Sequence, residues 1–303
     1  MKFLIAAIFC LTLLSEAKSQ NGFLPPSDQF NSARFRSVVA SEVGIGILAT
    51  TGLYFLWYRK HPLNHFHFFN DNCEWLQMDK IGHATTAYNV ASIQYDLMRW
   101  SGMQNQPSIA IGAVTALGYM SIIEVLDGFS TQWGFSKGDM AANLIGSALF
   151  ASQQKFWGGQ RISLKFSYHK TIYPKYHPEE LGNGWRESMI KDYNGQTYWL
   201  SFNIKSFLPA QSNFPAWLNM DVGYSGEGMT GARENPSVVD GKPIPHFQRY
   251  RQFFLSPDVD FSRISSGSYL FNAFGFISKT IKTPAPALEL DSLKTLKFKS
   301  LYY

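Results

Sequence analysis

Residues 79–98 read DKIGHATTAYNVASIQYDLM, an apolar stretch with helical spacing that begins with three ionisable side chains. On a helix that begins near Asp79, this carboxylate and the imidazole of His83 lie four residues apart and share one face. Lys80 lies roughly 100° around the helix axis, which leaves it free to face a neighbouring helix. Because an unpaired charge in apolar surroundings is costly, the stretch predicts polar partners for these side chains elsewhere in the chain.

A second polar pair, Glu124 and Asp127, lies at the C-terminal end of the apolar run 108–126. The two carboxylates are three residues apart and share a helical face. The helix dipole disfavours anions at this end of a helix. The pair therefore needs a compensating proton or cation, which His83, Lys80 or a metal ion could supply.

A third group lies in residues 136–146, SKGDMAANLIG. Ser136 and Asp139 have the spacing of a capping box, and the helix dipole favours a carboxylate at the position of Asp139. This structural explanation does not cover Asn143, which lies one turn later on the same face and ahead of Gly146, where close helix packing is possible. Two interpretations stay open: a buried network that only stabilises the packing, and a working site.

The three groups are expected to meet in one polar cluster between helices. The expected members are Asp79, His83, Glu124, Asp127, Asp139 and Asn143. His83 is the predicted proton carrier, because its ordinary pKa is the closest to neutrality. The other predicted roles are Asp79 and Glu124 as further catalytic residues, Lys80, Ser136 and Asn143 as ligand-binding residues, and Asp127 and Asp139 as ligands of a divalent metal ion.

The chain changes character near residue 160, where long apolar segments give way to aromatic and β-branched runs separated by Pro, Gly and Asn. This change predicts an α+β fold, with an N-terminal bundle of about four apolar helices in residues 20–158 and a β-rich C-terminal half in residues 159–303. Pro257 predicts an edge strand or a bend. The expected helices cover 38–58, 81–98, 108–126 and 140–157, and the expected strands cover 162–168, 197–204, 217–224, 250–261 and 296–303.

Residues 1–19 have the positive start, short apolar core and small residues of a signal peptide, which predicts export to the cell envelope and cleavage before Gln20. Lipid attachment at Cys10 is not expected, because Cys10 follows Phe9 inside the apolar core. Cleavage leaves Cys73 as the one cysteine, and so no intramolecular disulfide. The exported chain would carry a net charge of +4 without a clustered basic face, which favours membrane lipid or envelope proteins as partners and excludes nucleic acid.

Membrane contact is predicted from residues 38–58, which are long enough to cross a bilayer and have basic residues at both ends. A buried helix in a soluble bundle is the alternative, and Glu42 favours it. The C-terminal strands could contact an outer membrane, but a closed membrane barrel needs at least about eight strands of about ten residues. Five or six candidate strands favour a small sheet packed on the helices or lying at a membrane surface.

The loop between the first two expected helices holds His65, His67 and Cys73 among several aromatic residues. These three side chains could be drawn as metal ligands, but an irregular loop does not fix their geometry as zinc sites require. An aromatic loop at a membrane interface is the preferred interpretation.

The motifs D-K-x-x-H, E-x-x-D and S-x-x-D-x-x-x-N-x-x-G, in this order over about residues 79–150, resemble the YfiM-like family of uncharacterised predicted periplasmic lipoproteins. More distantly, they resemble the VanZ-like membrane proteins. Residues 191–201 and 249–256 resemble segments of longer Bacteroidetes-type members. The resemblance places shared polar positions at Asp79, Lys80, His83, Glu124, Asp127, Ser136, Asp139, Asn143 and Gly146.

VanZ-like proteins usually have E-x-x-Q followed by an arginine, whereas this chain has Asp127 and no arginine before Ser136. This departure weakens any transfer of the VanZ link to glycopeptide resistance. The YfiM-like family implies no established activity. The chain also contains no G-x-S-x-G elbow, Walker-type loop or H-E-x-x-H helix, so serine-hydrolase, nucleotide-hydrolase and zincin functions have no motif support.

Two functions are therefore expected. The first is a membrane-associated envelope protein whose helical site binds a lipid head group, a phosphate or a metal ion, with or without catalysis. The second is a structural envelope scaffold in which the same residues form a buried hydrogen-bond network. Accessibility separates the two, since a site must open on a pocket or a lipid interface whereas a network is sealed.

Overall fold

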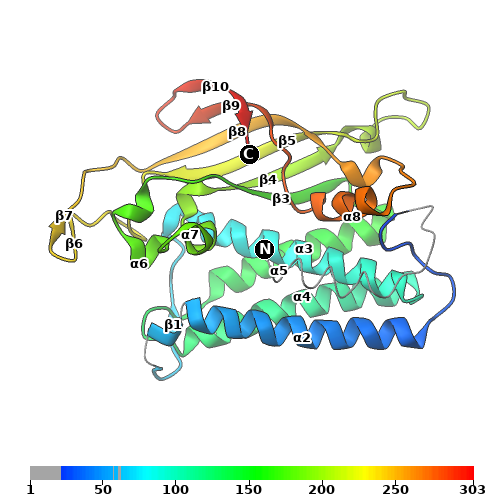
Figure 1. The fold of residues 1–303 in the computed structure, drawn as a ribbon, viewed down its shortest axis with the longest axis horizontal. Coiled ribbons are helices and arrows are strands. Elements are labelled where there is room, and N and C mark those ends of the chain that lie inside the picture. The colour runs from blue at the N-terminus through cyan, green and yellow to red at the C-terminus, as the bar shows by residue number, and fades with distance from the viewer. Residues whose placement is uncertain (1–21, 57, 61–62) are drawn as a thin grey trace.

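The computed structural model describes residues 22–56, 58–60 and 63–303. The predicted signal peptide and its cleavage before Gln20 lie outside these residues. The described chain forms a layer of long helices and a six-stranded sheet that lies over it (Figure 1). The predicted α+β class is confirmed.

Four long helices run side by side below the sheet in Figure 1; three of them contain the predicted helices 81–98, 108–126 and 140–157, and the first covers the predicted helix 38–58 as far as Leu56. Three of them, α3, α4 and α5, pack closely against one another. A Cβ atom on Gly146 would lie 2.0 Å from the carbonyl oxygen of Ala84, so glycine permits this close approach of α5 to α3. The helices are α2 (Ser32–Leu56), α3 (Met78–Trp100), α4 (Asn105–Gly128) and α5 (Lys137–Trp157).

The finer prediction of a bundle of about four helices is not confirmed, because the described residues contain seven α-helices. The three additional helices are short and lie in the C-terminal half, where the sequence predicts mostly strand and loop. The aromatic composition of the longest of them is equally typical of strands. They are α6 (Pro178–Leu181), α7 (Trp185–Lys191) and α8 (Tyr269–Ser278).

The large sheet is antiparallel, with the strand order β10-β9-β8-β5-β4-β3. Five of its strands lie where the sequence predicts them, within a few residues at each end. The sixth, β9, is not predicted, because it is short and holds Pro286, a residue that disfavours strands. The strands are β3 (Ile162–Tyr168), β4 (Gln196–Asn203), β5 (Leu218–Glu227), β8 (Tyr250–Val259), β9 (Ala285–Asp291) and β10 (Leu296–Tyr302).

Pro257 lies in β8, a strand inside the sheet. The pairing of β8 with β9 covers only Gln252 to Leu255, whereas the pairing with β5 continues to Val259. At Pro257 the strand therefore has a neighbour on one side only. This local edge accommodates a residue that has no backbone N–H to donate.

Two short strand pairs complete the fold. The pair that matters for the site joins β1 (Phe68–Phe69) to β2 (Phe135–Ser136) in parallel. It fixes the loop before α3 against the start of α5. The other pair is β6 (Val238–Val239) with β7 (Lys242–Pro243).

Two of the described helices, α2 and α4, are long and apolar enough to cross a membrane by length and composition. The apolar window of α2 is 6% buried and that of α4 is 28% buried. A core helix of a soluble protein passes the same test, so membrane contact of residues 38–58 stays a prediction. The low burial of α2 nevertheless distinguishes it from an ordinary core helix.

Candidate functional site

The predicted polar residues meet where three helix ends converge. A short connection joins α3 to α4 in an antiparallel pair, so the start of α3 lies beside the end of α4, and α5 begins at the same place. His83 is at the centre of the cluster. Its Nδ1 lies 3.1 Å from Asn143 Oδ1 and 3.5 Å from Glu124 Oε1. Its Nε2 lies 3.8 Å from Asp79 Oδ1 and 4.0 Å from Asp139 Oδ1.

Lys80 belongs to the same cluster, because it lies three residues before His83 on α3 and so shares a helical face with it. Its Nζ lies 2.7 Å from Asp71 Oδ1 and 2.8 Å from Asp139 Oδ1. Asp79 Oδ2 is 3.4 Å away. One ammonium group is thus shared by three carboxylates.

Ser136 caps α5 as the sequence predicts, because its Oγ accepts a hydrogen bond from the backbone N–H of Asp139 at 3.1 Å. In a full capping box, Asp139 would accept from the N–H of Ser136 in return. Here Glu124 Oε2 accepts that N–H instead, at 3.1 Å. The carboxylate of Asp139 is therefore left to face Lys80 and His83.

Asp127 lies on the same side of the cluster but is not in contact with His83. The hydroxyl of Tyr58 donates to Asp127 Oδ1 at 2.6 Å. Both residues line the same cavity as Asp79, His83 and Asp139. The structure thus brings together all the residues that the sequence selects, with Asp127 at the border.

Three further residues belong to the site and are not predicted. Asp71 bonds Lys80 and accepts from Ser136 Oγ at 2.7 Å, and the hydroxyl of Tyr193 donates to Asp79 Oδ1 at 2.6 Å. Tyr58 is the third. All three come from loops or short 3₁₀ helices far from their partners in sequence, where helical spacing gives no indication.

Burial controls the acid–base state of the carboxyl groups. It raises the pKa of Glu124 to about 7 and that of Asp127 to about 6. Burial and the nearby charge of Asp79 raise the pKa of Asp139 to about 8. These three groups take up or release protons near neutral pH.

The remaining charges of the cluster favour ionisation. Burial opposes the ionised form of Asp79, but the positive charges of His83 and Lys80 outweigh it and lower its pKa. Burial would lower the pKa of His83, but Asp79, Asp139 and Glu124 raise it above its ordinary value. Burial likewise opposes the charged form of Lys80, whose pKa is raised by the carboxylates around it.

The cluster opens on a cavity of about 590 Å³ whose floor is one face of α3. Along α3 the lining continues from Asp79 and His83 through Thr86 and Asn89 to Ile93. Met120 of α4 and Phe166 of β3 also line the cavity. The polar residues are therefore accessible to a ligand and are not sealed inside the helix packing.

Three buried polar atoms in the cluster lack a hydrogen-bond partner within the described residues, and one of them, Oδ1 of Asp139, is instead paired with the ammonium group of Lys80. Oε1 of Glu124 accepts no hydrogen bond, and Nδ2 of Asn143 donates none. Both residues are at most 1% exposed. Unsatisfied buried polar groups are rare in folded proteins and often mark a place where an ion, water or ligand binds.

Asp79, His83 and Asp139 lie close enough together to hold a metal ion between them. Each offers one ligand atom, and the three atoms lie within 4.8 Å of one another. Neutral His83 can donate from Nδ1 to Asn143 and keep Nε2 free as a ligand, which is the usual arrangement of a metal-binding histidine. Asp127, predicted as a metal ligand, does not belong to this group.

The histidine and cysteine loop does not form a comparable group in the described structure. His67 Nδ1 lies 3.2 Å from the carbonyl oxygen of His65, and Cys73 is exposed and free. Phe66 instead contacts Phe135 of β2, with ring centroids 5.7 Å apart. An aromatic loop, the preferred interpretation, agrees with these contacts.

Comparison with known proteins gives one match. Residues 67–154 match a family described as "Predicted periplasmic lipoprotein (DUF2279)". No curated protein and no solved structure matches the chain, and the more distant VanZ-like resemblance stays a prediction. The matched residues include the ionisable residues of the cluster and Asn143, but not Tyr58 or Tyr193, and the family description agrees with the predicted export to the periplasmic side of the envelope. Over residues 67–154 the chain thus matches this family of uncharacterised predicted periplasmic lipoproteins, as the motifs predict.

Proposed function

We propose that this is a membrane-associated protein of the cell envelope whose helical site binds a divalent metal ion. The observation that carries the proposal is the convergence of Asp79, His83 and Asp139 to within 4.8 Å at an accessible cavity. One imidazole and two carboxylates suit ions such as Zn²⁺ or Mn²⁺.

The surroundings of these three residues support the proposal. Asn143 and Glu124 lie beside Nδ1 of His83 and fix the ring, as outer-shell partners do in metal sites. Lys80 lies close to Asp79 and Asp139 and has a third carboxylate partner, Asp71. An entering metal ion would displace the ammonium group towards Asp71 without leaving it unpaired.

The excess of negative charge in the cluster favours some of the possible ligands over others. Five carboxyl groups, those of Asp71, Asp79, Glu124, Asp127 and Asp139, surround one lysine and one histidine. A free phosphate would meet this excess of negative charge, and the one lysine is already shared among three carboxylates. A cation, or a lipid head group that carries an amine, fits the charge better.

The same site contains groups that are able to move protons. With pKa values of about 7 and about 6, Glu124 and Asp127 lie near neutrality, where proton transfer is most effective. A bound metal ion would supply a water molecule of lowered pKa. Metal-assisted hydrolysis is therefore the reaction class to test after binding.

Titration calorimetry of the purified full chain with Zn²⁺ and Mn²⁺ tests the binding. We expect one site per chain, and His83→Ala and Asp139→Asn should each weaken binding by more than the roughly 10- to 100-fold that is typical of an outer-shell substitution. His67→Ala is the matched control, because it removes a histidine from the exposed loop. Equal affinity in the wild type and in the His83 and Asp139 variants would overturn the proposal.

The structural scaffold is the second candidate, and one observation favours it: Lys80 is already paired with three carboxylates. A scaffold predicts that His83→Ala and Asp139→Asn lower stability, because breaking a buried charge network costs about 3–5 kcal/mol. It also predicts no metal binding by the wild type. The same calorimetric titration therefore separates the two functions.

A further inference from the structure

One face of the large sheet carries a continuous row of apolar side chains across its last five strands. The strand register places Leu200, Val222, Leu255, Leu288 and Phe298 directly beside one another. Each of these side chains is 39–68% exposed. A second exposed row follows next to it, with Phe253, Leu290 and Leu296.

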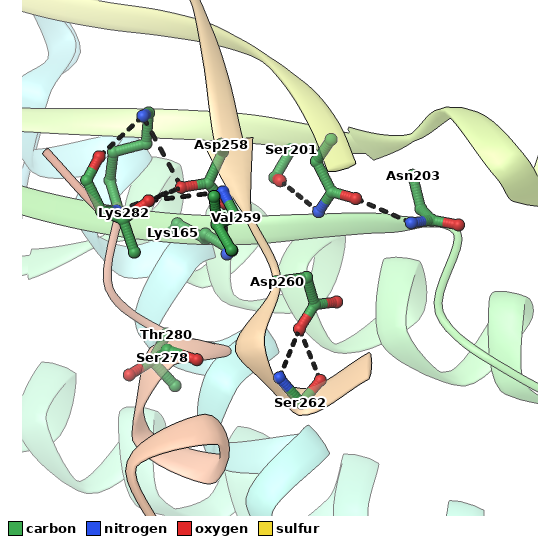
Figure 2. A network of polar contacts seen from close by, with 12 residues as sticks. Lys165, Ser201, Asn203, Asp258, Val259, Asp260, Ser262, Ser278, Thr280 and Lys282 are labelled. Carbon is green, nitrogen blue, oxygen red and sulfur yellow. Dashed lines mark hydrogen bonds and ion pairs between the residues drawn. The ribbon is translucent and has the colours of Figure 1, made fainter. Parts of the chain in front are cut away.

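The opposite face of the same strands is buried and mostly polar, apart from a small apolar cluster around Trp199 and Phe254. It carries Ser201, Asp221, Gln252, Asp258, Glu289 and Asp291, which are at most 6% exposed. Asp258 lies 2.5 Å from Lys165 Nζ and 3.6 Å from Lys282 Nζ. Figure 2 shows this network of lysine, aspartate and hydroxyl side chains against the strands.

Curvature of the sheet encloses this polar face. The segment before β9 runs beside β3, at the other edge of the sheet. There the N–H of Phe166 donates to the carbonyl oxygen of Thr280, and the N–H of Lys282 donates to the carbonyl oxygen of Phe166. Tyr302 of β10 stacks on Phe254 of β8 at 4.4 Å and bonds Thr197 of β4 at 2.9 Å. The polar face is therefore the inside of the curved sheet, and the apolar face is its outside.

This arrangement is the reverse of a sheet in water, which keeps its apolar face inside and its polar face in the solvent. Sheets that meet lipid have an apolar outer face and a polar interior. Near β3 the outer face is covered by the helices, because Leu164 packs in one cluster with Tyr88 of α3. On β5 the residues before α3 still cover Tyr224, whose hydroxyl donates to the carbonyl oxygen of Leu76, but the named side chains of the two rows are 39–69% exposed.

We infer that the outer face of β5, β8, β9 and β10 lies in the hydrocarbon of one bilayer leaflet. The inverted polarity identifies lipid as the occupant. Aromatic residues that flank an apolar band are typical of the membrane interface. Here Phe207 and Trp217, which are 49% and 40% exposed, lie at the end of the sheet where β4 leads to β5.

The height of the apolar band limits the depth of insertion. Successive outward residues on a strand are about 7 Å apart, so the two rows and the next outward residue, Met220 of β5, which is 38% exposed, cover about 14 Å. A barrel that crosses a membrane needs an apolar band of about 25 Å, whereas half of a hydrocarbon core is about 15 Å. The sheet face thus matches one leaflet and does not cross the bilayer.

Fluorescent labels at single cysteines test the inference on the full chain. Leu255→Cys and Leu288→Cys are prepared on a Cys10→Ser and Cys73→Ser background, with Val238→Cys on the exposed β6 as the control. The protein is bound to vesicles of phosphatidylethanolamine and phosphatidylglycerol that carry nitroxides on the acyl chains. Labels at 255 and 288 should be quenched, and the label at 238 should not.

Labels at 255 and 288 that stay in water on vesicle-bound protein would overturn the inference. If the labels are shielded from water without vesicles, and the shielding increases with protein concentration, a second copy of the chain covers this face. That result would also overturn the inference. Leu255→Gln and Leu288→Gln should each lower vesicle partitioning about tenfold, whereas Val238→Gln should change it little.

The inference rests on the membrane association in the proposed function and not on the metal ion. Leu288→Gln should leave the metal affinity unchanged. If the wild-type protein binds no vesicles, the membrane association in the proposed function is refuted. If Leu255→Gln and Leu288→Gln still bind vesicles as the wild type does, only the inference about the sheet face is refuted.

Discussion

Among the described residues, one cluster of buried charged side chains lies between the helix ends and another lies inside the curved sheet, and the two clusters differ in balance and access. Inside the sheet, two lysines, Lys165 and Lys282, meet Asp221 and Asp258, and none of these four residues lines the large cavity. Between the helices, carboxyl groups outnumber the cations and face that cavity. Burial of charge is therefore common to both clusters, whereas excess charge and access to the cavity distinguish the helix-end cluster.

The largest expected effect tests the sheet cluster. Replacing Lys165 by Met leaves Asp258 buried without its closest partner, so the free energy of unfolding should fall by about 3–5 kcal/mol. Urea unfolding followed by circular dichroism measures the change. In the control, Lys279→Met breaks the partly exposed pair with Asp96 and should cost at most about 1 kcal/mol.

If the two clusters are independent, Lys165→Met should leave metal binding intact under conditions where the variant is folded. A loss of metal affinity that accompanies a fully native spectrum would show that the two clusters are coupled. The distinction between a structural network and a site would then fail.

The second effect is a pH dependence of the helix-end cluster. The pKa values of Glu124, Asp127 and Asp139 are raised to about 7, about 6 and about 8, so the folded state binds more protons than the unfolded state between about pH 4 and pH 8. The raised pKa of His83 also makes the folded state bind more protons than the unfolded state above about pH 6.5. Stability of the metal-free protein should therefore fall as the pH rises.

Asp139 alone, with a pKa of about 8, should account for a loss on the order of 4 kcal/mol between pH 5 and pH 8, since one pKa unit corresponds to about 1.4 kcal/mol. Urea unfolding at a series of pH values with a chelator present measures it. Asp139→Asn should flatten the profile, and saturating metal should reverse its slope, because metal binds the deprotonated ligands. A profile that rises with pH in the metal-free protein would contradict this assignment.

Much of the helix-end cluster could be predicted from sequence, because helical spacing is a local property. Asp79 and His83 are one turn apart, as are Asp139 and Asn143, and apolar surroundings indicate that such pairs need partners. Tyr193 could not be predicted in the same way. It lies 114 residues from Asp79, and only the packing of the sheet half on α3 brings them together.

In the sheet, the sequence predicts the alternation of side chains but not the position of each face. Alternation in β5, where Asn219 and Asp221 alternate with Met220 and Val222, indicates two faces of different polarity. It does not show which face is inside. That depends on the curvature set by contacts between distant strands, such as Tyr302 with Phe254.

The third effect concerns the close contact of α3 and α5. In Gly146→Ala, the new methyl group would meet the carbonyl oxygen of Ala84 and push the helices apart, at a cost of about 1–3 kcal/mol. Metal affinity should fall as well, because Asn143 lies one turn before Gly146. Gly118→Ala in α4 is the matched control, since nothing lies within 4 Å of its added atom, and it should stabilise the protein by up to about 1 kcal/mol. Similar thermal midpoints for the two variants would show that α3 and α5 are not packed this closely.

The smallest effect separates capping from site formation. Ser136 accepts from the N–H of Asp139 and also donates to Asp71, whereas Ser268, the N-cap of α8, accepts from the N–H of Phe271 at 3.4 Å far from the cluster. Both Ser136→Ala and Ser268→Ala should cost about 1 kcal/mol in unfolding free energy through loss of the cap. Only Ser136→Ala should also weaken metal binding, because Asp71 loses the contact that holds it beside Lys80 and the cluster becomes less ordered. Equal stability losses with unchanged metal affinity in both variants would show that Ser136 is a helix cap alone, and that the site is formed without it.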